Sequence, residues 1–524
     1  MDNEDAEASP APEEHDLTLD LGDLWPRRER RQLGRRGHRE VEAIEPSTWR
    51  QRIPLLVLVA LYVGYFSYES LRLYATYNYP PFDLAIFDQG MWLLSHFHAP
   101  FVTIMGRNLF GDHTSFNLLL LVPVYRLVPE PQGLLVLQTL AIGAAALPIF
   151  ALARRATRSV GIATAMAAVY LLSPALQQVN LEQFHPEGLQ VLVFTLAIYA
   201  AVESRGRLLA VMVLLTLLTK EDAALLVVPL GLWVAARRDR RWGAYIVVAG
   251  VAYAVVANAW VIPAFLGGST LYAGRIPFGG VSGFLRTLLT RPRQVWQLLH
   301  SEGRLFYLWQ MGLSAGWLFV LAPEMAALAL LAFLENELSV DPYMHQIFYH
   351  YSLRIVPVLV VGTAWAIGRR RRRWLRAAMT LGTLTCAVVS CVWWGLAPFS
   401  RSPEPIDDAA GAAVATAMTH LVTDLPANAS VSALYPLVSH IDHRQHVYVW
   451  PAPFVPSNWG LPATASQTLP PPFSVTYLIL PGRLGAGNDA DIFTSISSAY
   501  YVRARFGGYV LYERHKGGPP PGAT

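Results

Sequence analysis

Acidic and histidine side chains crowd the stretch that follows the first long apolar segment of the chain. From Tyr79 to His113 they lie among aromatic residues, and the stretch contains Asp83, Asp88, His96, His98, Asp112 and His113. Carboxylates between the hydrophobic segments of a membrane protein are costly to bury, so they are either solvated loop residues or parts of a site at the membrane surface. We favour a site, because a positioned carboxylate can serve as a general base.

Further polar motifs interrupt the apolar sequence downstream. Glu182–Glu187 (EQFHPE) opens one hydrophobic segment, Lys220–Asp222 (KED) separates two short ones, and Asp341–His345 with Tyr349–Tyr351 precedes another. For any single motif a water-solvated loop explains the residues equally well. The Lys220 triplet is the exception, because its short apolar flanks place it in or near the bilayer edge, where ionisable residues are functional candidates by default.

The composition indicates a polytopic membrane protein. The chain has 524 residues, of which 53% are hydrophobic and 15% charged, and its mean hydropathy is +0.33. These values exclude an ordinary soluble protein. The net charge of +4 comes from basic runs beside apolar segments, a pattern typical of cytoplasmic loops rather than of a nucleic-acid-binding surface. The cysteines, Cys386 and Cys391, supply neither a metal motif nor a disulfide framework.

Hydropathy predicts about eleven membrane-spanning helices of near bilayer-crossing length. The first, Ile53–Ala75, is a signal anchor whose preceding basic run keeps the N-terminus in the cytoplasm. The short pairs on either side of Lys220 and of Pro323 are alternatively broken or re-entrant helices. The later segments are 132–153, 160–178, 187–203, 207–220, 222–236, 243–266, 304–321, 322–335, 352–368 and 375–397.

The arginine-rich loops all fall on the cytoplasmic side of this threading, except for the long 268–303 loop, which we place outside. The polar motifs and the C-terminal segment then lie outside the cytoplasm. In the first external loop, the runs 84–94 and 116–128 are predicted to be interfacial helices on the outer leaflet, which would hold Asp88 and Asp112 at the level of the lipid headgroups.

The two ends of the chain differ from the apolar middle. Residues 1–50 read as a disordered cytoplasmic tail, 51–397 as the transmembrane domain, and 516–524 as a flexible tail. Residues 398–515 predict a small extracytoplasmic α/β domain with no catalytic motif, which caps the membrane domain or supports its acceptor-binding face. Its expected strands lie near 430–438, 446–449, 475–480 and 509–512, and its helices near 408–424 and 490–500.

Taken in order, the motifs resemble a known family. Tyr79–Trp92 (YPPFDLAIFDQGMW), Gly111–His113 with the LLLLVPVYRLVP run, Phe184–Glu187 and Thr219–Asp222 are similar to bacterial polytopic membrane proteins grouped as domain-of-unknown-function family 2079. That family in turn resembles the type C (GT-C) glycosyltransferases. These polytopic enzymes take a sugar from a polyprenyl-phosphate donor and keep a catalytic aspartate in the first external loop. The resemblance implies an all-α, GT-C-like membrane domain.

The resemblance also implies roles for individual residues. Asp88, slightly ahead of Asp83, is the expected base for the acceptor hydroxyl, and Lys220 would hold the donor phosphate with help from arginines of the 268–303 loop. A divalent cation bound by His185 and His113 with Asp88 and Glu187 is an alternative, so the metal and any cofactor stay open. The full set of expected substrate-binding residues is Lys220, Glu221, Asp222, His185, Glu187, Asp112, His113 and His345.

The functional hypothesis is a plasma-membrane glycosyltransferase that acts on its outer face. Its expected partners are a polyprenyl-phosphate sugar donor, a glycan, glycolipid or glycoprotein acceptor, and membrane lipid, without nucleic acid. The alternative is a transporter or lipid flippase, with Lys220 in a broken helix pair that lines a substrate path. A transporter should have polar groups near the midplane and symmetric halves, and the sequence has no convincing internal repeat. An inactive scaffold with the same fold is a third alternative.

Overall fold

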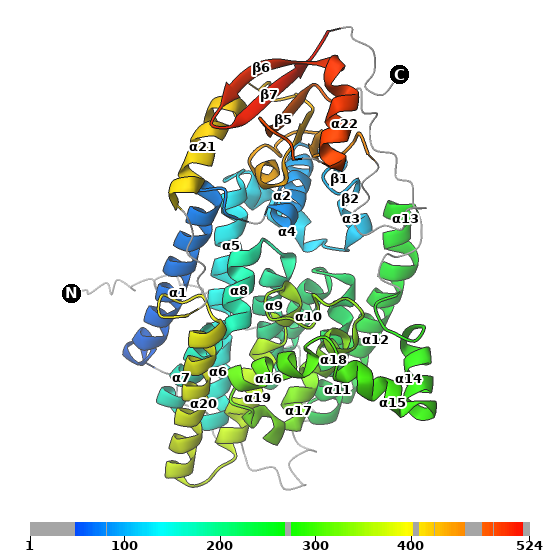
Figure 1. Cartoon of the computed structure of the whole chain (residues 1–524). Helices are drawn as coiled ribbons and strands as arrows, with labels where there is room; N and C mark the ends of the chain where they lie inside the picture. Colours follow the sequence, from blue (N-terminus) through cyan, green and yellow to red (C-terminus); the bar gives the residue numbers. More distant parts are fainter. Residues whose placement is uncertain are drawn as a thin grey trace, which may run out of the picture.

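The computed structural model describes residues 48–79, 81–267, 274–401, 408–423, 425–455, 474–485 and 487–516. Helices make up a long body, and a five-stranded sheet lies beyond one end of it (Figure 1). The predicted tails, apart from residues 48–50 and Lys516, lie outside the described residues, as does most of the proline-rich 451–472 stretch.

The first helix, α1 (Trp49–Ala75), connects the two parts of the molecule. It begins with a capping box, in which Thr48 and Gln51 each bond the other's backbone N–H through their side chains. Its 27 residues span about 40 Å at 1.5 Å per residue, which is long enough to cross a bilayer.

Five helices are long and apolar enough to cross a membrane, and a bent pair makes a sixth, among the described residues. The bent pair consists of α7 (Val160–Leu171) and α8 (Pro174–Glu182), which meet at 44°. The predicted count of about eleven is therefore not confirmed. The five are α1; α5 (Pro131–Ala144) with α6 (Ala146–Thr157); α12 (Arg240–Val256) with η4 (Ala257–Val261) and α13 (Ile262–Leu266); η7 (His350–Ser352) with α19 (Val356–Gly368); and α20 (Arg373–Trp394).

The other predicted spans are short helices separated by backbone breaks. Lys220 has an extended backbone, with φ −168° and ψ 155°. The helix α10 (Gly206–Leu217) therefore does not continue through Lys220 into the next helix. Gly316 and Trp317 adopt positive φ values of 70° and 60°, so no helix continues through them. The short helices are α9 (Pro186–Val202), α10 (Gly206–Leu217), η3 (Glu221–Ala223), α11 (Ala224–Arg237), α16 (Arg304–Ser314), η5 (Leu318–Leu321), α17 (Pro323–Ala326), η6 (Ala327–Ala329) and α18 (Leu330–Leu338).

The loop 268–303 also contains helices within its described part. These are α14 (Gly280–Thr290) and α15 (Pro292–Leu299), and both leave apolar side chains such as Leu289 and Trp296 exposed. Basic and apolar side chains thus share these two helices, as in helices that lie along a membrane surface.

The central and outer helices differ in burial. In the central span formed by η7 and α19, 83% of the residues in the most apolar 18-residue stretch are buried. The corresponding share is 22% in α1, in the α12 span and in α20. The outer helices expose large apolar side chains, among them Leu61, Val248 and Leu381. In water such surfaces would aggregate, so they are suited to contact with lipid.

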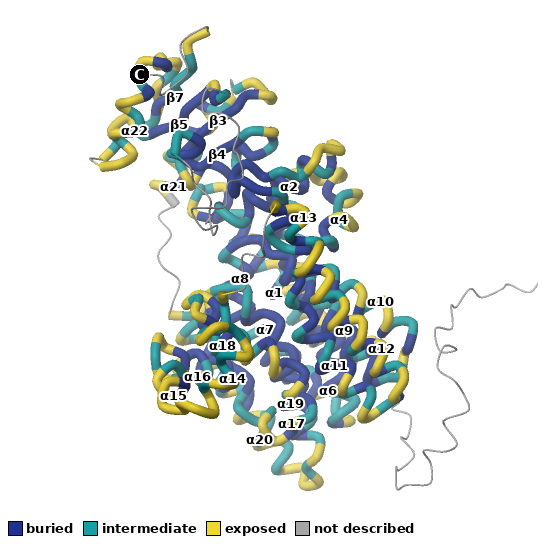
Figure 2. Tube along the Cα trace, turned by 90° about the vertical axis from the view of Figure 1, so that its right-hand side faces the viewer, coloured by how far each residue is buried: buried dark blue, intermediate teal, exposed yellow. Residues whose placement is uncertain are grey.

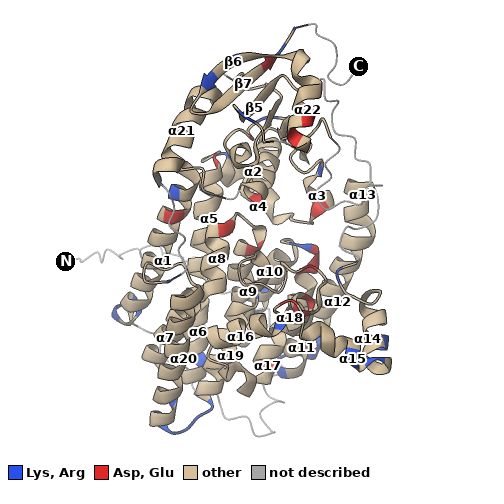
Figure 3. Cartoon of the chain, viewed as in Figure 1, with Lys and Arg blue, Asp and Glu red and all other residues tan. Residues whose placement is uncertain are grey.

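The basic loops meet at one end of the helical body. Arg155 lies 3.6 Å from Glu203, Arg238 donates to the Val202 carbonyl at 2.7 Å, and Gly368 packs against the backbone of Ala156. In Figure 3 the arginine loop between α19 and α20 marks this end, whereas most acidic residues lie further toward the sheet. The predicted grouping of the basic loops on one side agrees with this arrangement.

The segment after α1 forms a separate layer between the body and the sheet. It contains α2 (Phe82–Ser95), β1 (Phe101–Val102), β2 (Arg107–Asn108), α3 (Leu109–Asp112) and α4 (Asn117–Tyr125). Helix α4 exposes Leu120 and Val124, as an interfacial helix would. The same prediction for 84–94 is wrong, because α2 is buried along almost its whole length, with the 3-10 helix η8 (Tyr435–His440) packed against it.

The C-terminal region is a small α/β unit, as predicted. Its strands follow the order β4-β3-β5-β7-β6, with β3 parallel to β4 and β5, and with β7 antiparallel to β5 and β6. Strand β6 was missed because it is an exposed edge strand with alternating arginines and few buried residues. The elements are α21 (Asp408–Val422), β3 (Val431–Ala433), β4 (Val447–Val449), β5 (Tyr477–Pro481), α22 (Asn488–Ile496), η10 (Ser497–Ala499), β6 (Tyr500–Phe506) and β7 (Tyr509–Arg514).

The sheet shares a hydrophobic core with the layer beneath it. Alternate strand residues such as Val447 and Ile479 face α2, whereas Tyr448 and Leu478 face α22. His440 also stacks on Tyr74 and Tyr77 at the end of α1, with ring centroids 4.0 and 3.7 Å apart. Figure 2 shows the buried trace running from α2 into β3 and β4. The sheet therefore holds residues 441–446 against α2.

Candidate functional site

The breaks between helices bring the distant polar motifs together. The chain turns sharply between α8 and α9, between α10 and η3, and before η7, and these turns meet the start of α2 and the end of α3. We call the resulting group the polar cluster. It consists of Asp83, Asp112, His113, Glu182, His185, Glu187, Lys220, Glu221, Asp222, Glu335, His350 and Arg354.

A buried ion pair lies at the centre of the polar cluster. Lys220 Nζ donates to Glu187 Oε1 at 2.6 Å, and the two side chains are 2% and 6% exposed. The ring of Tyr351 lies beneath the ammonium group, 5.5 Å from it, and also 5.7 Å from the guanidinium of Arg275. Two cations from separate segments thus contact the same aromatic ring.

The remaining members of the KED motif bind different neighbours. Glu221 accepts from the Thr114 backbone at 3.2 Å and lies 2.8 Å from His113 Nδ1, which ties the layer after α1 to the helical body. Asp222 lies 2.8 Å from Arg354, which donates to Glu335 at the same distance. The triplet therefore connects three parts of the polar cluster.

Two cavities lie along helix α18. The first, of about 290 Å³, is lined by Glu221, Asp222, Arg275 and Glu335 together with apolar residues of α11 and α12. The second, of about 380 Å³, is almost entirely apolar, and its lining includes Leu330 and Phe333 of α18. A polar cavity and an apolar one therefore lie along the same short helix.

Asp83 begins α2 and belongs to the polar cluster. Its carboxylate lies 3.8 Å from His185 Nε2, and its backbone N–H donates to the side-chain oxygen of Gln183. Desolvation by the surrounding protein raises the pKa of Asp83 to about 6, against the lowering effect of His185. For His185 the neighbouring carboxylates of Glu182 and Asp83 outweigh desolvation and raise the pKa.

Asp88, the residue expected to be the base, has different neighbours. It is fully buried, its Oδ1 accepts from Tyr125 Oη at 2.7 Å, and its Oδ2 lies 2.7 Å from His443 Nε2. Both oxygens are therefore engaged, and the C-terminal region covers the side chain. This geometry suits a residue that fastens the sheet to α2 better than one that meets substrate, so the expected preference for Asp88 over Asp83 is not supported.

The structure adds residues that the sequence prediction missed and removes one that it included. His443 and Asp442 come from a region without an expected catalytic motif, although the dense polar run His440–His446 was a visible signal. His345 does not join the polar cluster, because Arg304 Nη1 lies 2.7 Å from its Nδ1 at the start of α16. The nearby His350 takes that place in the polar cluster.

The Asp88–His443 contact should make attachment of the C-terminal region depend on pH. The hydrogen bond to Asp88 raises the pKa of His443 despite the opposing effect of burial. A raised pKa means that the contact stabilises the fold below the usual histidine value of about 6.5 and loses this contribution as the pH rises through the shifted value. We expect amide hydrogen exchange in α2 to become roughly threefold faster, after correction for intrinsic rates, between pH 6 and 9. His443→Gln should remove the pH dependence, and an equal slope in both proteins would contradict this assignment.

Comparison with solved structures identifies a protein of similar overall fold. The crystal structure of ArnT from Cupriavidus metallidurans bound to undecaprenyl phosphate superposes with a TM-score of 0.52, covering 90% of this chain and 100% of that chain at 13% identity. At that identity the likeness shows the fold, and it confirms the resemblance to type C glycosyltransferases at that level.

Comparison at the sequence level gives the family. No curated protein matches the chain. The sequence model described as "Predicted membrane protein (DUF2079)" matches residues 73–458, a range that contains the Asp83 and Asp88 motif, the FHPE and KED motifs and the His440–His446 run. The chain therefore belongs to the DUF2079 family of membrane proteins.

Proposed function

We propose that the protein is an integral-membrane glycosyltransferase that transfers a sugar from a polyprenyl-phosphate donor to a cell-envelope acceptor. The observation that carries this proposal is that the polar cluster brings the Asp83 carboxylate close to buried cations and adjoins a polar cavity, with an apolar cavity along the same α18 helix. The undecaprenyl phosphate bound to ArnT, a protein of the same fold, supports the donor class.

The two cavities suit the two parts of such a donor. A polyprenyl chain needs an apolar groove, and the pocket that contains Leu330 and Phe333 offers one. A phosphate needs cations that stabilise the charge developing as the sugar departs. Arg275 lines the polar cavity, and Lys220 contacts the same Tyr351 ring as Arg275. We assign the phosphate to these two cations.

Asp83 is the proposed base. The acceptor hydroxyl oxygen forms a bond to the anomeric carbon of the sugar while the bond from that carbon to the phosphate oxygen breaks. The hydroxyl proton passes to Asp83, and polyprenyl phosphate leaves with the bonding electrons. Asp83 suits this role because it begins α2 within the polar cluster and its carboxylate has no hydrogen bond as short as those of Asp88 among the described residues.

The proposed orientation follows from the charge distribution. The arginine loops at one end of the body should face the cytoplasm, because Lys and Arg accumulate on that side of bacterial membranes. The polar cluster and the sheet then lie on the outer face of the plasma membrane, where lipid-linked sugars meet envelope acceptors.

Lipid and glycan analysis of a strain that lacks the protein tests the function. Mass spectrometry should reveal the loss of one sugar from an envelope glycan, glycolipid or glycoprotein, together with accumulation of the polyprenyl-phosphate sugar. Purified protein should then transfer radiolabelled sugar from that lipid to the extracted acceptor. An unchanged envelope, with labelled lipid merely crossing the membrane of reconstituted vesicles, would favour the transporter alternative and refute the enzyme.

A further inference from the structure

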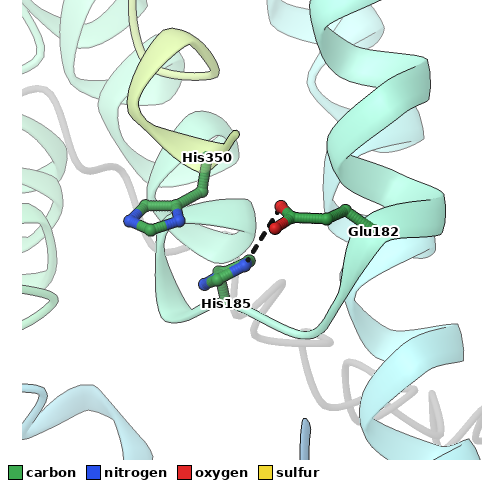
Figure 4. A group of neighbouring side chains, drawn as sticks. All are labelled: Glu182, His185 and His350. Atoms are coloured by element: carbon green, nitrogen blue, oxygen red, sulfur yellow. Dashed lines mark ion pairs between the residues drawn. The ribbon is translucent and has the colours of Figure 1, made fainter. Parts of the chain in front are cut away.

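Three side chains in the polar cluster direct potential metal-ligand atoms at one point. Glu182, His185 and His350 each offer one ligand atom, and these atoms lie within 4.8 Å of one another. Figure 4 shows the two imidazole rings and the carboxylate facing a common space, with the Glu182–His185 contact marked. Glu182 and His185 lie on the same turn between α8 and α9, whereas His350 comes from η7, so local helix geometry alone does not explain the convergence of all three.

The three atoms lack the hydrogen bonds that buried polar atoms normally make. Among the described residues, Glu182 Oε2, His185 Nε2 and His350 Nδ1 have no hydrogen-bond partner. His185 as a whole is only 2% exposed. Leaving one buried polar atom unpaired costs about 1–3 kcal/mol, so three such atoms side by side, of which Glu182 Oε2 and His185 Nε2 form only a long ion pair, favour a further binding partner.

The spacing of these atoms fits a metal better than a simple ion pair. Glu182 Oε2 and His185 Nε2 are 3.5 Å apart, which is long for a charge-assisted hydrogen bond. Two ligands of a tetrahedral zinc ion, each about 2.0–2.1 Å from the metal, are separated by about 3.3 Å. A cation between the two atoms would require only a small adjustment.

The supporting contacts resemble those around histidine metal ligands. Glu187 Oε1 lies 3.6 Å from the other nitrogen of His350, and Lys220 holds this carboxylate. Metal-binding histidines usually direct the second ring nitrogen at a carboxylate or carbonyl, which sets the tautomer. The backbone N–H of His185 donates to Gln138 Oε1 at 2.7 Å, so the turn that carries this residue is also anchored.

The charge around the three ligands also favours a cation. The polar cluster contains more Asp and Glu residues than Lys and Arg residues. This holds even when Arg107 and Arg275, which adjoin the cluster, are counted with Lys220 and Arg354. Buried negative charge needs compensation. Asp83 Oδ2, 3.8 Å from His185 Nε2, adds a further carboxylate beside the three atoms.

We propose that Glu182, His185 and His350 bind a divalent transition-metal cation, with zinc the best match and Asp83 beside the open coordination position. Two imidazoles and one carboxylate form a donor set typical of zinc sites that keep a position for water or substrate. The other group of this kind, Asp88 with Asp442 and His443, is a weaker candidate because both oxygens of Asp88 already bind protein groups. Metal binding is a claim separate from sugar transfer.

Metal titration of the purified full-length protein tests the site without any substrate. After removal of metal with a chelator and dialysis, Co²⁺ should bind with one ion per chain and produce visible absorption bands of a four- or five-coordinate N/O site. Zn²⁺ should displace it. His185→Gln, His350→Gln and Glu182→Gln should each weaken Zn²⁺ binding by roughly tenfold or more, because even supporting residues of metal sites contribute that much.

Two buried or half-buried histidines outside the site provide matched controls. His345→Gln and His443→Gln should leave the Co²⁺ spectrum and the Zn²⁺ affinity unchanged. The proposal is overturned if the wild-type protein binds neither ion, or if His443→Gln removes the metal while His185→Gln does not. Should the site variants fail to fold, the wild-type Co²⁺ titration still decides, because no spectrum means no site. A protein that binds zinc but transfers no sugar would refute the proposed function and leave the metal site intact.

Discussion

Asp83→Asn lowers sugar transfer by roughly a thousandfold, within the range of losses expected when a general base is removed, and leaves folding intact. The substitution keeps the size of the side chain and its position at the start of α2, but an amide cannot accept the acceptor proton. The measurement is initial-rate transfer of labelled sugar by purified protein, with thermal unfolding in the same detergent as the test of folding.

Asp88→Asn is the matched control on the same helix. Asp88 is buried with both oxygens bonded, so its loss should reduce stability by about 1–3 kcal/mol and loosen the C-terminal region. The residual folded protein should transfer sugar at a rate far above that of Asp83→Asn. If the two variants lose activity to the same extent at full stability, Asp83 is not the specific base. Zinc content measured in Asp83→Asn separates loss of the base from loss of a metal.

Lys220→Met destabilises the protein by about 3–5 kcal/mol, the usual result of breaking a buried ion pair from one side. The substitution leaves the Glu187 carboxylate, whose side chain is 6% exposed, without the ammonium group 2.6 Å away. Methionine fills a similar volume, so the loss reflects charge rather than packing. Thermal unfolding in detergent, followed by tryptophan fluorescence, measures the change.

Two comparisons make this prediction specific. The double variant Lys220→Met/Glu187→Gln removes both charges and should recover much of the lost stability, because no uncompensated buried charge remains. Arg503→Met breaks the exposed Arg503–Glu513 pair at 2.6 Å and should change stability by no more than about 1 kcal/mol. A Lys220→Met effect as small as that of Arg503→Met would mean that water reaches the pair and that the polar cluster is open.

The sequence by itself determined which segments are apolar, that a small α/β unit follows them, and that Asp83, His185 and Lys220 lie beside helix ends. Hydropathy and turn residues are local properties, so these predictions needed no knowledge of packing. Because hydropathy is a local property, it could not determine the number of membrane-spanning helices. Apolar composition does not reveal where the backbone breaks, and positive φ at Gly316 and Trp317 divides a run that looks continuous.

Only the tertiary structure decided which of the two acids lies in the polar cluster. Asp83 and Asp88 lie five positions apart in one motif, and the sequence gives each a similar environment. Their difference comes from His443, far along the chain, which reaches Asp88 because the sheet packs its apolar face on α2. The convergence of Glu182, His185 and His350 has the same origin. Contacts between distant segments depend on how whole elements pack, and no local pattern records that packing.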